Sequence, residues 1–135
     1  MNEFKVPIEG TYRRLQSLKQ EIIHITEEII DSGKYLSSKR VSRLEKSLET
    51  AWGRNAVATN SGSSALQLAL LAAGVKAGDE VIVPALTFVS TAYAVSAIGA
   101  IPVFVDIDPY TYTIDPNAVR AAITDKTTAM IPVHI

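Results

Sequence analysis

Short apolar runs alternate with helix-like segments from residue 56 to the end of the chain. The runs are short enough for strands and contain few polar residues, which is typical of strands buried on both faces of a parallel sheet. Alternating strands and helices predict an α/β layered fold. The predicted strands are Ala56–Thr59, Glu80–Val83, Ile101–Val105 and Thr128–Val133, and the predicted helices are Ser63–Gly74, Thr87–Ile98 and Pro116–Ile123 with Asp115 as its N-cap.

Two amphipathic helices are predicted before this region. In the first, apolar residues recur every three or four positions, and Ser32-Gly33 ends the helix with a left-handed glycine. Such an apolar face must pack on something, and another subunit is one candidate. The second helix starts at Ser38 or Ser42 and ends at Gly53. The two apolar faces consist of Leu15, Leu18, Ile22, Ile25 and Ile29, and of Val41, Leu44, Leu48 and Trp52.

Composition narrows the class of protein. The chain has 135 residues, of which 47% are hydrophobic and 20% charged, so it is expected to be globular and able to bury a core. A net charge of -1 does not indicate binding to nucleic acid or to an acidic membrane surface. Without cysteine there is no disulfide framework, thiolate nucleophile or cysteine-ligated metal site. The charged start lacks the apolar run of a secretory signal, and no apolar run could span a bilayer, so a cytoplasmic protein is expected.

The segment Asn60–Leu66 reads as a tight polar turn between a strand and an apolar helix. It places serine hydroxyls and unpaired backbone N–H groups at a helix N-terminus, where a phosphate group is favoured. The alternative is that Ser61 or Ser63 simply caps the helix, and the turn taken alone favours the cap.

The next strand end adds an aromatic residue. If the loop that holds Phe88 lies on the same sheet edge as the serine turn, its ring faces a planar ligand whose phosphate sits on Ser63 and Ser64. The alternative for Phe88 is an ordinary core position. Neither G-x-G-x-x-G nor G-x-x-x-x-G-K-[ST] occurs, so a standard dinucleotide site and a P-loop are both unsupported.

Five motifs follow one another along the chain: Asn60–Leu66, Gly78–Pro84, Thr87–Thr91, Gly99–Asp108 and Ile131–His134. Together and in this order they resemble one family, the DegT/DnrJ/EryC1/StrS aminotransferases. These are pyridoxal-phosphate enzymes that aminate nucleotide-linked keto-sugars. Ser32-Gly33 followed by an aromatic residue is also similar to the N-terminal region of the family.

The resemblance implies a fold, a cofactor and roles for four residues. The fold is the fold-type-I transferase large domain, with a largely parallel seven-stranded sheet and helices on both faces. Residues 1–37 would be an N-terminal helical segment and connector, and 38–135 the N-terminal half of the large domain. The cofactor is pyridoxal 5'-phosphate, with its phosphate on Ser63 and Ser64 and its ring on Phe88. Tyr35 falls in a region that approaches the sugar, often that of the neighbouring subunit in a homodimer, although a plain surface or interface role is equally open.

The resemblance also implies that the catalytic groups are not in this sequence. The lysine that forms the Schiff base and the aspartate that pairs with the pyridinium nitrogen lie beyond the His134 motif in complete members. Among the seven lysines, five precede the sheet, and Lys76 and Lys126 are expected at the opposite edge. Asp106 and Asp108 are expected to shape a turn, and His134 to be a satisfied structural histidine.

The expected function is therefore that of the N-terminal part of a sugar aminotransferase. The complete enzyme would transfer an amino group, from a donor such as glutamate, to a nucleotide-linked keto-sugar in polysaccharide or glycan biosynthesis. The domain looks incomplete, and the chain alone is expected to be inactive. Alternatives are a truncated or split-gene partner chain without catalysis, a pyridoxal-phosphate-dependent sugar dehydratase, and an unrelated nucleotide-binding α/β domain.

Overall fold

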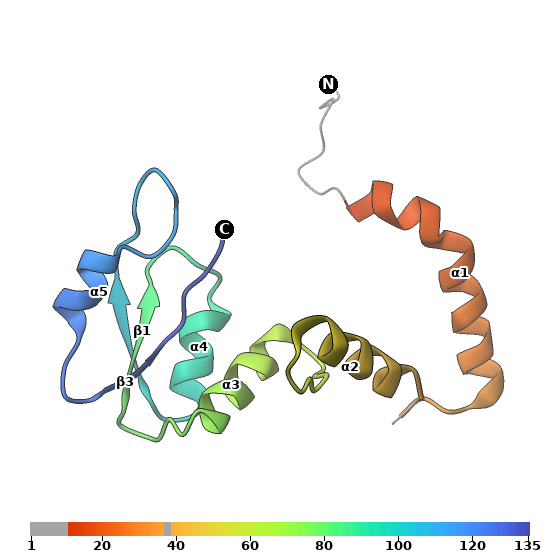
Figure 1. Ribbon diagram of the computed structural model, residues 1–135, viewed down its shortest axis with the longest axis horizontal. Helices are drawn as coiled ribbons and strands as arrows, with labels where there is room; N and C mark the ends of the chain where they lie inside the picture. The colour runs from red at the N-terminus through yellow and green to blue at the C-terminus, as the bar shows by residue number, and fades with distance from the viewer. Residues whose placement is uncertain (1–10, 37–38) are drawn as a thin grey trace. The chain divides into compact units, whose positions relative to one another are not determined.

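The computed structural model describes residues 11–36 and 39–135 (Figure 1). The described residues form two compact units, which divide between Val57 and Ala58. The predicted domain boundary between residues 37 and 38 concerns the longer family fold and stays a prediction.

The first unit contains two helices. Helix α1 spans Thr11–Ser32, and Gly33 follows with φ 62°, as predicted for a left-handed cap. Helix α2 spans Lys39–Trp52 and is followed by Gly53 with φ 63°. A start at Ser42 is therefore wrong, because that residue lies inside α2, and Ser38 lies outside the described residues. On α1, Leu15, Leu18 and Ile22 keep 44%, 47% and 44% of their surface exposed.

The second unit is an α/β layer, as predicted. Its strands are β1 Glu80–Pro84, β2 Ile101–Val105 and β3 Thr127–Met130, and its helices are α3 Gly62–Ala72, α4 Ser90–Ala97 and α5 Pro116–Ala122. The parallel sheet has the order β2-β1-β3, so the chain passes from β1 to β2 on one side and then returns past β1 to β3 on the other. Right-handed crossovers then place α4 and α5 on opposite faces, and Figure 1 shows the sheet between them. Helix α3 packs beside α4.

Strand β1 forms the centre of the core. Successive side chains of a strand point to opposite faces, so Val81 and Val83 face the α3–α4 layer while Ile82 faces the other side. All three are at most 1% exposed. Leu70 of α3 and Val95 of α4 belong to the same buried cluster as Val81 and Val83. This core fixes the relative positions of the first turns of α3 and α4.

Two sequence-based expectations about the strands are wrong. Residues 56–59 form no strand, because none of the described strands pairs with them, and a strand needs a hydrogen-bonded neighbour. Burial on both faces holds for β1 but not for its neighbours, since Phe104 of β2 is 58% exposed and Met130 of β3 is 56% exposed. Both neighbours are edge strands of the described sheet, with less covering them.

The remaining differences are shifts of element ends. Helix α4 begins at Ser90 and not at Thr87, because residues 85–89 form a loop after β1. Strand β3 ends at Met130, although the Ile131 N–H still donates to the Ile82 carbonyl oxygen at 2.9 Å. The described residues include no helix long and apolar enough to cross a membrane.

Candidate functional site

A cleft of about 810 Å³ opens at the carboxyl edge of the sheet. Four segments line it: residues 62–69 of α3, the first turn of α4, the loop after β1, and residues 133–135 after β3. In Figure 1 the C-terminal segment runs up beside the loop that joins β1 to α4. The edge is the one where ligands bind in open α/β sheets, because the loops at the strand ends converge there.

The three hydroxyls of the serine turn have different partners. Ser61 is the N-cap of α3, because its Oγ accepts the Ser64 N–H at 3.2 Å. Ser64 Oγ also lies 3.0 Å from Ser61 Oγ, and Ser64 is not among the residues that line the cleft. Ser63 does line the cleft, and its hydroxyl donates to Ser90 Oγ at 2.8 Å. The capping role predicted as an alternative thus belongs to Ser61, and the structure brings only Ser63 of the predicted phosphate pair to the cleft.

Phe88 lies in the same cleft, on the loop after β1. It is 76% exposed, so the alternative of an ordinary core phenylalanine is wrong. Two interactions fix the loop: Thr87 Oγ1 lies 2.9 Å from Thr91 Oγ1, and the Thr91 N–H donates to the Phe88 carbonyl oxygen at 3.0 Å. Thr91 is 5% exposed, so its side of this contact is buried.

Sequence reasoning missed Ser90 and Thr91 as cleft residues. Both fall in the motif Thr87–Thr91, but that motif singled out only the aromatic residue. The available signal was their place at the start of a helix that directly follows a strand end, the same arrangement that drew attention to Ser63.

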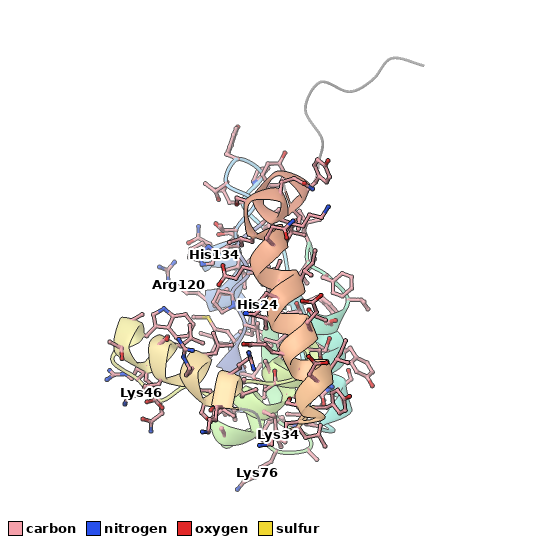
Figure 2. The ribbon with its side chains drawn as sticks, turned by 90° about the vertical axis from the view of Figure 1, so that its right-hand side faces the viewer. His24, Lys34, Lys46, Lys76, Arg120 and His134 are labelled. Atoms are coloured by element: carbon pink, nitrogen blue, oxygen red, sulfur yellow. The ribbon has the colours of Figure 1, made fainter. Side chains whose placement is uncertain are left out.

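His134 differs from the expected satisfied structural histidine. Its side chain is exposed at the cleft and makes no hydrogen bond within the described part of the chain. Lys76 and Lys126 precede β1 and β3, at the amino edge, as predicted. Figure 2 shows Lys76 at the lower end of the second unit, well away from His134. His24 belongs to the first unit, where its Nε2 lies 3.5 Å from Glu28 Oε1.

Tyr35 belongs to the first unit and is 66% exposed. It lines a hollow of about 1060 Å³ together with charged residues near the end of α1 and the start of α2. Among these, Glu28 and Arg40 form an ion pair. A substrate role for Tyr35 stays a prediction.

Asp106 and Asp108 shape a turn, as predicted. Asp106 Oδ1 accepts the Ile107 N–H at 2.8 Å, and Asp108 Oδ1 accepts the N–H groups of Tyr110 and Thr111 at 2.8 and 2.9 Å. The backbone hydrogen bonds from Thr111 and then Tyr110 lower the pKa of the Asp108 carboxyl, because they favour its charged form.

Comparison with known proteins decides the family. The sequence model of the DegT/DnrJ/EryC1/StrS aminotransferase family matches residues 16–135. The chain belongs to this family. The resemblance seen in the motifs is therefore confirmed, and with it the α/β transferase fold. The solved structure of NtdA from Bacillus subtilis with bound cofactor PMP is 38% identical to the chain, with a TM-score of 0.88, and the match covers 100% of this chain and 32% of NtdA.

Three curated relatives match most of the chain. A pleiotropic regulatory protein of Geobacillus stearothermophilus is 42% identical over 96% of this chain and 35% of its own length. The 3-oxo-glucose-6-phosphate:glutamate aminotransferase of B. subtilis is 41% identical over 86% and 26%. The UDP-2-acetamido-2-deoxy-3-oxo-D-glucuronate aminotransferase of Pseudomonas aeruginosa is 41% identical over 87% and 33%. The chain thus spans between about a quarter and a third of the length of these relatives.

The cleft has the chemical character that the family cofactor requires. A phosphate needs hydrogen-bond donors, and the Ser63–Ser90 hydroxyl pair lies beside the first N–H groups of α3, which have no acceptor within the helix. A pyridine ring needs an apolar wall, and Leu66, Val133 and the exposed face of Phe88 line the same space. A metal centre has no such support, since the described residues include no group of three or more His, Asp or Glu side chains that could hold an ion.

Proposed function

We propose that this chain is the N-terminal part of a pyridoxal-phosphate-dependent aminotransferase and that its cleft holds the cofactor. The single observation that carries the proposal is that the Ser63 hydroxyl and the exposed Phe88 ring line one cleft, at the carboxyl edge of a parallel sheet. Family membership supplies the identity of the group that such a cleft would take.

Each part of the cleft has a distinct task in this proposal. Ser63 and the N-terminus of α3 bind the phosphate, because hydroxyl and N–H donors and the helix dipole favour an anion there. Ser64 is also proposed to contact the phosphate, for which its hydroxyl or its backbone N–H would have to leave Ser61 Oγ, because both are engaged there. Phe88 orients the pyridine ring by stacking. When bound, pyridoxal 5'-phosphate supplies an electron sink for amino-group transfer, and the protein supplies binding and orientation.

The proposed reaction moves an amino group from glutamate to a nucleotide-linked keto-sugar, in polysaccharide or glycan biosynthesis in the cytoplasm. The named activities of two relatives support this: one is a glutamate aminotransferase and the other acts on a UDP-linked 3-oxo sugar. Tyr35 is proposed to approach the sugar. Within the second unit, whose residues 58–135 are all described, no lysine is placed to anchor the cofactor covalently, because Lys76 and Lys126 lie at the opposite edge of the sheet. We therefore expect no turnover from the chain alone.

The cofactor proposal is tested by titrating the chain with pyridoxine 5'-phosphate and following the heat of binding. This alcohol analogue has no aldehyde, so it cannot react with surface lysines and reports only the non-covalent site. Binding is expected for the unmodified chain and is expected to weaken in Ser63→Ala. A chain that does not bind the analogue at all would contradict the proposal. Sustained amino transfer from glutamate by the chain alone would contradict the expected inactivity.

A homodimer is proposed on the strength of α1, whose apolar face Leu15, Leu18 and Ile22 is exposed in the described chain. Sedimentation equilibrium of Ile22→Glu is expected to show weaker self-association than the unmodified chain. Gln20→Glu is the matched control, because it adds one negative charge to the same helix on the side away from the apolar face. A folded, monomeric unmodified chain at all concentrations would overturn the dimer proposal.

A further inference from the structure

A hydrogen bond between two serine side chains joins the first turns of α3 and α4. Ser63 Oγ lies 2.8 Å from Ser90 Oγ, and both residues are half-buried at the cleft. The two helices are held together below this contact by the buried cluster that includes Leu70 and Val95. The separation of the two hydroxyls is therefore set by the packing of the core.

The other hydroxyls of the serine turn are already engaged, which leaves Ser63 with Ser90 as its partner. Ser61 Oγ accepts the Ser64 N–H and contacts the Ser64 hydroxyl. A hydroxyl has one proton to donate and two lone pairs to accept with. The Ser63–Ser90 pair therefore holds two protons, of which the mutual hydrogen bond uses one, and the second is available to an anion in the cleft.

The position of the anion decides which of the two protons it takes. Ser63 stands in the first turn of α3, an eleven-residue helix whose first N–H groups point toward the same end of the cleft. An anion held by those N–H groups is adjacent to Ser63. The Ser63 proton, which now goes to Ser90, would then turn to the anion, and the Ser90 proton would turn to Ser63 Oγ.

We propose that Ser90 is a positioning residue of the phosphate site that acts through Ser63. It fixes the Ser63 side chain in one of its staggered rotamers and, when the anion is bound, donates to Ser63 Oγ so that the Ser63 proton points to the phosphate. Only hydrogen bonds change partners, and no proton leaves either oxygen. This inference rests on the proposed cofactor site and adds a residue that the sequence motifs did not single out.

The test is a double-mutant cycle on binding of pyridoxine 5'-phosphate, with Ser63→Ala, Ser90→Ala and the double variant. Loss of one neutral hydrogen bond predicts about three- to tenfold weaker binding for Ser90→Ala. Because Ser90 acts through Ser63, adding Ser90→Ala to Ser63→Ala is expected to cause no further loss. Ser90→Thr keeps the hydroxyl and is expected to restore binding. The ³¹P chemical shift of the bound analogue should move in the same direction in both single variants.

Ser96→Ala is the matched control, because Ser96 is an exposed serine on the same helix and does not line the cleft. It is expected to bind like the unmodified chain. Unmodified binding by Ser90→Ala would overturn the inference and leave the cofactor site standing. Additive losses in the double variant would overturn it too, since they would mean that Ser90 contacts the anion independently. Absence of binding by the unmodified chain would overturn both the inference and the proposed site.

Discussion

Ser61 Oγ accepts the backbone N–H of Ser64 across 3.2 Å and thereby caps helix α3. Ser63 lies between these two residues in the turn and lines the cleft. It takes no part in the cap, and its hydroxyl donates to Ser90 Oγ instead. One short turn thus assigns one serine to helix stability and another to the cleft. The two roles can be separated by substitution.

Replacing Ser61 with alanine is expected to lower the free energy of unfolding by about 0.5–2 kcal/mol, the usual effect of losing an N-cap. Urea denaturation measures the change, with Ser96→Ala as the control. Ser61→Asp is expected to keep the stability, because aspartate is also a good N-cap. The added negative charge should nevertheless weaken binding of pyridoxine 5'-phosphate. Stronger binding by Ser61→Asp would contradict an anion site beside this turn.

Phe88→Ala is expected to weaken binding of pyridoxine 5'-phosphate by up to about tenfold, since stacking contributes about 0.5–1.5 kcal/mol beyond burial. Its effect on the free energy of unfolding should be small, because the side chain is 76% exposed. Calorimetric titration and urea denaturation of the same variant separate the two effects. Tyr110→Ala removes a 91% exposed ring outside the cleft and should change neither quantity. Unchanged affinity in Phe88→Ala would remove the ring from the site.

Gly99→Ala is expected to destabilise the second unit more than Gly74→Ala. Both glycines have a left-handed backbone, with φ 81° and φ 87°, so both substitutions carry the strain of a side chain in that region. A Cβ at Gly99 would also lie 3.0 Å from Ala77 Cβ, whereas a Cβ at Gly74 meets nothing within 4 Å. The difference in urea midpoint between the two variants measures this contact alone. Equal midpoints would show that the chain around Ala77 yields freely.

The Asp108 turn is expected to loosen in acid. The pKa of this carboxyl is lowered in the folded chain, so its stabilising hydrogen bonds are fully present above the ordinary aspartate pKa of about 3.9 and are lost as pH falls through the lower, folded value. The amide NMR shifts of Tyr110 and Thr111 should therefore titrate with a midpoint below about 3.9. Asp108→Asn keeps an acceptor oxygen but cannot titrate there, and it should abolish the transition. A midpoint above the ordinary value would contradict the assignment.

Features with a local cause were predicted well from the sequence. Strand Ile101–Val105 was predicted with its observed bounds, and Asp115 caps α5, because apolar runs and capping residues act over a few positions. The strand predicted at residues 56–59 is not observed, because a strand forms only where a neighbouring strand pairs with it, and a local pattern does not show whether that neighbour is present. The site residues show the same difference between local signals and contacts between distant residues. Ser63 and Phe88 were found through turn and strand-end signals, whereas Ser90 was missed because its partner lies far away in the sequence.

The strand order also determines when the cleft can exist. Strand β1 pairs on one side with β2, and only helix α4 separates these two strands in the sequence. On its other side β1 pairs with β3, which follows both β2 and α5 in the sequence. Among the described segments that line the cleft, residues 133–135 therefore follow the others in the chain and join loops that precede them. During synthesis, the β1–α4–β2 unit can form while the cleft is still open on one side. A ligand that contacts residues 133–135 as well as the earlier loops would bind only after β3 has paired with β1, and it would stabilise that pairing.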